Sequence, residues 1–173
     1  MSDVRTNRAY LLLGSNIDPA GNLPAAVREL QKHGRVVGVS QVYESAPAGY
    51  ADQPNFLNAA VLLETPLSAR ELRFDVIAGI ERGLGRVRDP GNKNAPRTID
   101  VDIALFNHEV LRSDGGLRIP DPDILDRLFV ARPLAELDPD YVHPETNRTL
   151  REIAAALEPT GKLKPRPDLR LAF

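Results

Sequence analysis

The chain has 173 residues, of which 22 are Lys or Arg and 24 are Asp or Glu, so its formal net charge is −2. This balance gives no global electrostatic reason to expect a nucleic acid or a membrane surface as partner. Cysteine is absent, which excludes disulfide bonds and thiolate metal sites. The sequence has neither a signal-peptide stretch nor an apolar run long enough to span a membrane, so we expect a soluble, cytoplasmic protein.

The first half of the chain predicts three strands and one helix. The strands are apolar or β-branched runs bounded by turn residues, at 9–13, 36–43 and 56–63. Between the first two, Asn22 can cap a helix, Pro24 lies just inside its start, and Gly34 can close it.

The second half predicts a helix, a strand and two further helices. Ser68 and Glu71 have the capping-box spacing, so a helix begins there and ends near Gly83. The remaining elements are a strand at 98–106 and helices at roughly 123–136 and 150–157.

The order β-α-β-β-α-β predicts an α+β fold, a ferredoxin-like αβα sandwich with a C-terminal helical addition. We expect one domain over residues 1–160 and a loose, basic tail over 161–173. This topology hosts many unrelated functions, so the function has to be argued from particular residues.

Two aspartates carry the chemistry of the predicted last strand. Asp100 and Asp102 are two apart and therefore point to one face, while Ile99, Val101 and Ile103 point to the core. Two like charges on one strand face repel each other, and a hard divalent cation such as Mg²⁺ compensates them directly. The alternative is an exposed sheet face with two solvated aspartates.

The loop before this strand is rich in cations: Arg82, Arg86, Arg88, Lys93 and Arg97. Paired carboxylates beside fixed cations suit a metal–polyphosphate complex, in which the carboxylates bind metal and the cations bind phosphate oxygens. Arg97 follows Pro96 at the strand mouth, whereas Arg86 and Arg88 could equally be solvated loop residues. Glu81 lies near a helix C-terminus, where the macrodipole disfavours a carboxylate, so it either serves the site or pairs with Arg82 or Arg86.

Four stretches in order resemble the 6-hydroxymethyl-7,8-dihydropterin pyrophosphokinase family. They are AYLLLGSN at 9–16, DQPNFLNAA at 52–60, KNAPRTIDVDIA at 93–104, and RLFV with RPL within 127–134. The resemblance covers about residues 8–157. It implies an enzyme that transfers the pyrophosphoryl group of ATP to the hydroxymethyl oxygen of the reduced pterin, giving AMP and the pterin pyrophosphate in folate biosynthesis.

The resemblance also implies roles for particular residues. Asp100 and Asp102 would bind two Mg²⁺ ions, and Arg86 and Arg97 would act with them as catalytic residues. The pterin would be bound by Ser45, Ala48, Phe56, Asn58 and Phe129. The ATP-binding residues would be Glu81, Arg88, Lys93, Asp121 and Arg127.

One departure from the family pattern concerns the nucleotide. The family usually has Pro-His-Pro where this chain has Pro120-Asp121-Pro122, so we expect weaker nucleotide binding with the chemistry retained. We expect a monomer whose partners are small molecules, with no nucleic acid and no membrane. Two alternatives remain: a catalytically impaired ferredoxin-like module that binds a ligand or RNA, and a phosphotransferase with another flat heterocycle as acceptor.

Overall fold

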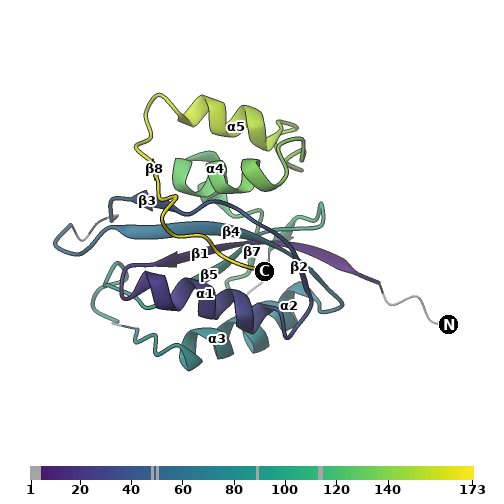
Figure 1. Cartoon of the computed structure of the whole chain (residues 1–173). Coiled ribbons are helices and arrows are strands. Elements are labelled where there is room, and N and C mark those ends of the chain that lie inside the picture. The colour runs from purple at the N-terminus through teal and green to yellow at the C-terminus, as the bar shows by residue number, and fades with distance from the viewer. Residues whose placement is uncertain (1–4, 48, 50, 89, 113–114) are drawn as a thin grey trace.

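The computed structural model describes residues 5–47, 49, 51–88, 90–112 and 115–173. Within them, six strands form one antiparallel sheet in the order β5-β1-β4-β3-β8, with β2 also pairing with β4 (Figure 1). The strands are β1 (Asn7–Ser15), β2 (Arg35–Val39), β3 (Tyr43–Ser45), β4 (Phe56–Thr65), β5 (Asp100–Phe106) and β8 (Lys164–Pro165). Apart from the short edge strand β8, this is the strand order of a ferredoxin-like fold, as the sequence predicted.

Helices cover both faces of the sheet (Figure 1). On one face lie α1 (Pro19–Leu30) and a continuous helical segment made of α2 (Ala69–Glu71), the π-helical turn η1 (Leu72–Ile77) and α3 (Ala78–Gly83). On the other lie the 3₁₀ turn η2 (Pro122–Leu125), α4 (Leu128–Leu137) and α5 (Leu150–Leu157). A separate ribbon pairs β6 (Leu111–Arg112) with β7 (Arg118–Ile119).

The central strand β1 explains why two helical layers form. Its side chains alternate between the faces: Leu11 and Leu13 belong to the core under α1 and η1, whereas Tyr10 and Leu12 belong to the core under α4 and α5. Both sets are almost fully buried, which is why residues 9–13 are continuously apolar.

The predicted element boundaries change at three places. Helix α1 begins at Pro19 rather than after Asn22, because Asp18 turns the chain with a positive φ of 44°. The strand expected at 36–43 is two strands, β2 and β3; between them Ser40 interrupts the ladder by accepting a hydrogen bond from the Ala60 amide through Oγ (2.8 Å). The helix expected at 123–136 is the turn η2 followed by α4.

The C-terminal segment, expected to be a loose tail, lies along the sheet in the structure. Strand β8 pairs with β3, the Arg166 amide donates to the Val42 carbonyl (2.8 Å), and Leu171 is buried. Among the described residues, no helix is both long and apolar enough to cross a bilayer.

Candidate active site

The floor of the site is a row of three residues on neighbouring strands. Asn58 of β4 pairs with Gly14 of β1, and Gly14 pairs in turn with Asp100 of β5. A Cβ atom at Gly14 would lie 3.5 Å from the Oδ1 atom of Asn58, so a larger side chain there would fill the space above the row. The sheet therefore presents an amide and a carboxylate on either side of an open glycine.

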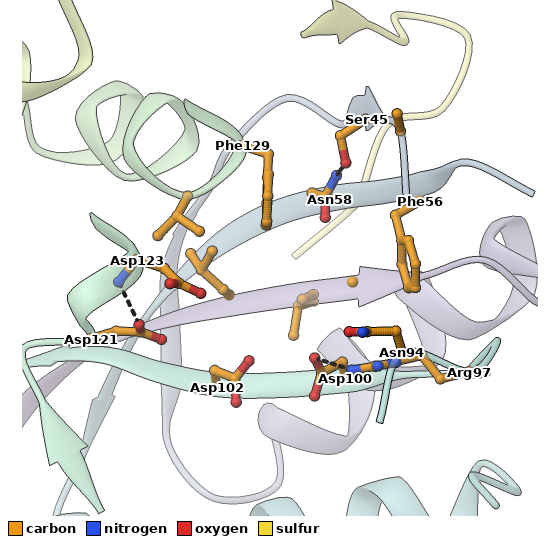
Figure 2. Close-up of a pocket in the computed structure, with 15 residues that line it drawn as sticks. Ser45, Phe56, Asn58, Asn94, Arg97, Asp100, Asp102, Asp121, Asp123 and Phe129 are labelled. Carbon is orange, nitrogen blue, oxygen red and sulfur yellow. Dashed lines mark hydrogen bonds and ion pairs between the residues drawn. The ribbon is translucent and has the colours of Figure 1, made fainter. Parts of the chain in front are cut away.

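Asp100 and Asp102 share one face of β5, as predicted. Their neighbours Ile99, Val101 and Ile103 are buried in the core on the opposite face. The structure thus directs both carboxylates away from that core, and both residues line the cavity drawn in Figure 2.

A cavity of about 210 Å³ opens above Asn58 and is called the aromatic cavity here. Phe56 and Phe129 lie on opposite sides of it (Figure 2). Asn58 is almost fully buried and donates from Nδ2 to the Ser45 hydroxyl (2.8 Å) and to the Tyr43 carbonyl (3.2 Å). These bonds fix the amide plane, so its orientation does not depend on a ligand. Ala48, also predicted to contact the pterin, lies outside the described residues.

A second cavity of about 580 Å³ adjoins the first and is called the cationic cavity. Its lining includes Arg73, Arg86, Arg88, Lys93 and Arg97. Arg97, Asp100 and Asp102 line both cavities. The predicted magnesium ligands therefore stand at the boundary between a flat aromatic space and a space lined by positive charge.

Ion pairs organise the cations around Asp100. Arg86 donates to Oδ1 of Asp100 (2.9 Å) and Arg97 donates to Oδ2 (3.0 Å). Arg86 also pairs with Glu81, which is only 4% exposed and lies 3.8 Å from Arg88. A carboxylate this buried needs cationic partners, so the pairing interpretation of Glu81 agrees with the geometry.

Asp102 lacks such compensation, because no described cation forms an ion pair with it. Desolvation by the groups packed around it, followed by the charges of Asp100 and Asp121, raises the pKa of Asp102 to about 7, against the opposing effects of Arg73 and Arg86. The residue as a whole nevertheless exposes surface to solvent and lines both cavities, so a bound cation can reach it.

The two aspartates fit a Mg²⁺ site only in part. Within the described residues no group of three or more His, Cys, Asp or Glu side chains is close enough to hold a metal. Magnesium commonly takes one or two carboxylates and completes its shell with waters and substrate phosphates, which suits a pair of aspartates beside a cationic cavity.

The sequence missed the role of Asn16 as a link between loops. This residue is 5% exposed; its Nδ2 donates to Gln53 Oε1 (2.7 Å) and the Pro54 carbonyl (3.1 Å), and its Oδ1 accepts from the Arg97 amide (2.8 Å). Gln53 donates to the Asn94 carbonyl (2.6 Å). No local pattern in the sequence reveals these long-range bonds.

The structure places Asp121 and Arg127 away from the cationic cavity. Asp121 caps η2 by accepting from the Asp123 amide (2.9 Å), and it lines the aromatic cavity beside Asp102 (Figure 2). Arg127 is exposed just before α4 and lines neither cavity. Arg88 and Lys93 line the cationic cavity.

The fold and site together define a class of protein, an α+β domain in which a cavity with two aromatic side chains adjoins a cavity lined by cations. The family model of 7,8-dihydro-6-hydroxymethylpterin-pyrophosphokinase matches residues 10–139, and the chain belongs to this family. Membership confirms the predicted enzyme class and reaction, ATP-dependent pyrophosphoryl transfer to hydroxymethyldihydropterin in folate synthesis.

Individual relatives agree with this assignment. The chain is similar to 2-amino-4-hydroxy-6-hydroxymethyldihydropteridine pyrophosphokinases of Bacillus subtilis (45% identity, covering 76% of this chain and 78% of the relative) and Methylorubrum extorquens (43%, covering 89% and 96%). Among solved structures, wild-type HPPK-DHPS of Plasmodium falciparum superposes with a TM-score of 0.68 at 17% identity, over 88% of this chain and 45% of that one. The chain thus spans less than half of that structure, and the likeness supports the fold alone.

Proposed function

We propose that the chain binds 6-hydroxymethyl-7,8-dihydropterin in the aromatic cavity and the triphosphate of ATP in the cationic cavity, and transfers the β,γ-pyrophosphoryl group between them. The observation that carries this proposal is that the two cavities meet at Asp100, Asp102 and Arg97. An acceptor oxygen and a phosphate brought to this boundary would be held within reach of each other, which is the main requirement for such a transfer.

The aromatic cavity suits a pterin for two reasons. Phe56 and Phe129 offer ring surfaces on either side, and a flat heterocycle stacks favourably on aromatic rings. Both N–H groups of the Asn58 side chain donate to Ser45 and Tyr43, which holds the amide in place and leaves its Oδ1 atom to accept from an N–H group on the pterin edge. We propose Ser45 and Asn58 as the polar recognition residues.

Mg²⁺ would be held by Asp100 and Asp102, with the remaining positions taken by phosphate oxygens and water. Two such ions, when bound, would neutralise the triphosphate and hold it for attack. In the structure both oxygens of Asp100 accept hydrogen bonds from Arg86 and Arg97. We propose that bound metal takes over the Asp100 oxygens, while the triphosphate binds the two guanidinium groups that leave them.

In the proposed reaction the hydroxymethyl oxygen attacks the β-phosphorus and releases its proton to solvent, the bond from the β-phosphorus to the α–β bridging oxygen breaks, and AMP leaves. Arg86 and Arg97 would stabilise the negative charge that moves onto this bridging oxygen, while Arg88 and Lys93 would hold the outer phosphates. No covalent intermediate with the protein is required, so positioning and electrostatics account for catalysis. We further propose that the protein works as a monomer.

One assay tests the proposal. The protein is incubated with ATP, Mg²⁺ and the reduced hydroxymethylpterin, and the nucleotide product is identified chromatographically. AMP that forms only when the pterin is present supports the proposal. ADP as the product, or AMP formed equally without pterin, would refute it. Omission of Mg²⁺ with EDTA present should abolish turnover if the aspartates act through the metal.

A further inference from the structure

Arg73 is a cation of the site that the expected set of residues does not include. It lies in the π-helical turn η1, is half-buried, and lines the cationic cavity together with Glu81, Arg86 and Arg97. Its position in the sequence, on a helix preceding the cation-rich loop, gives no sign of this placement.

The π-helical turn explains how Arg73 reaches the cavity. In an α-helix each residue turns by about 100°, so positions eight apart, such as 73 and 81, differ by about 80° around the axis. A π-helical turn has more residues per turn and therefore rotates each by less, which removes part of this offset. Arg73 and Glu81 consequently face the same cavity, while Leu72, Val76 and Ile77 remain in the core.

Arg73 also differs from the other arginines of the cavity in its ion pairing. Three other arginines line the cavity, and each lies within ion-pair distance of a described carboxylate: Arg86 and Arg97 at Asp100, and Arg88 at Glu81. Arg73 forms no ion pair with any described residue; its guanidinium lies 5.7 Å from the centroid of the Phe74 ring, and its charge acts on Asp102 only from beyond ion-pair distance. A half-buried cation on a cavity wall that forms no ion pair with a described carboxylate is suited to an anionic ligand.

We propose that Arg73 is a phosphate-binding residue for the nucleotide, delivered into the cationic cavity by the π-helical turn. The inference rests on the proposed function, because the anion is the triphosphate assigned to that cavity. Arg86 and Arg97 must break an ion pair with Asp100 before they bind phosphate, whereas Arg73 forms no ion pair with a described residue. Its guanidinium can therefore bind phosphate without such a rearrangement. An arginine also offers the planar pair of donors that phosphate oxygens accept.

The test compares Arg73→Gln, Arg73→Lys and the control Arg70→Gln. Arg70 has the same charge, lies three residues earlier, and contacts the same Phe74 ring (5.1 Å), but it lines neither cavity at the site. Dissociation constants are measured by calorimetry for Mg²⁺ with α,β-methylene-ATP, which is not cleaved at the reacting bond, and separately for the pterin.

Arg73→Gln should weaken binding of the nucleotide analogue about tenfold or more, since a hydrogen bond to a charged group is lost. Arg73→Lys should recover part of this loss. Arg70→Gln should bind like the wild type, and all three variants should keep the wild-type affinity for the pterin.

Two results would overturn the inference: unchanged nucleotide affinity in Arg73→Gln, or an equal loss in Arg70→Gln. If the wild type forms AMP and Arg73→Gln binds the nucleotide as tightly as the wild type does, only the proposed role of Arg73 is refuted. If the wild type itself binds no nucleotide, the proposed function falls as well, so the two failures can be told apart.

Discussion

Asn16 and Arg97 form a reciprocal pair of hydrogen bonds across 81 positions of the chain. The backbone N–H of Asn16 donates to the Arg97 carbonyl (3.2 Å), and the backbone N–H of Arg97 donates to the side-chain Oδ1 of Asn16 (2.8 Å). The turn after β1 thereby fixes the backbone of Arg97, whose guanidinium donates to Asp100. Through its Nδ2 atom, Asn16 also holds the loop that leads to Phe56. One buried amide thus sets the position of elements from both cavities.

We predict that Asn16→Ala reduces kcat by about tenfold or more, because small displacements of a catalytic group are costly. The variant should also lose about 1–3 kcal/mol of unfolding free energy, because buried polar groups lose their partners. Steady-state kinetics and urea unfolding measure the two effects. Asn22→Ala is the control, since its half-buried side-chain amide donates to the Ile17 carbonyl and lines neither cavity, and it should keep wild-type kcat. Equal kinetics for Asn16→Ala and the wild type would contradict the positioning role.

A second prediction concerns stability against pH without metal. The pKa of Asp102 is raised to about 7, so from about pH 4 to 7 the folded protein retains a proton that the unfolded chain loses. This contribution to stability therefore falls as the pH rises through that window. Asp102→Asn removes the charge, and its advantage over the wild type in urea unfolding with EDTA should grow between pH 5 and pH 8. A difference that does not change with pH would disprove this assignment.

The same variant should lose turnover while gaining stability. Asp102→Ala, Asp102→Asn and Asp100→Ala are each expected to lower kcat by about a hundredfold or more, because removal of one electrostatic stabiliser costs several kcal/mol of barrier. Circular dichroism should remain that of a folded protein. Retained turnover in either Asp100→Ala or Asp102→Ala would exclude a metal role for that residue.

The aromatic pair should determine affinity for the pterin and leave nucleotide affinity unchanged. Phe56→Ala or Phe129→Ala removes one stacking surface and should weaken pterin binding about tenfold, measured by calorimetry in the absence of nucleotide. Phe173→Ala, at the exposed C-terminus, is the matched control. If the two site variants weaken the nucleotide analogue and the pterin equally, the division of the site into two substrate cavities is wrong.

Asp121 gives a prediction about nucleotide affinity. Its carboxylate is one of the charges that raise the pKa of Asp102, and its own pKa is raised, mainly by burial. Asp121→His should tighten binding of ATP, because it removes a negative charge that acts on Asp102 at the boundary of the cationic cavity, and should leave the reaction products unchanged. An unchanged dissociation constant for ATP would contradict this. Asp123→Asn controls for a general loss of charge at η2.

The sequence alone determined the architecture and the chemistry of β5. Alternation along residues 99–103 showed which side chains are buried and which two carboxylates share a face, since a strand has a period of two residues. Local patterns also located the main helices. They did not locate the break at Ser40, because it depends on a hydrogen bond to a partner strand 20 residues away.

Only the tertiary structure decided which loop residues belong to the site. Asn16, Gln53 and Arg97 are far apart in the sequence, and their bonds exist only because β1, β4 and β5 are neighbours in one sheet. In the structure Arg127 lies outside both cavities. Arg73 lines one of them, because the π-helical turn changes the direction in which its side chain points. The physical reason is that side-chain periodicity is a local property, whereas a binding site is assembled from long-range contacts whose geometry depends on how the whole chain packs.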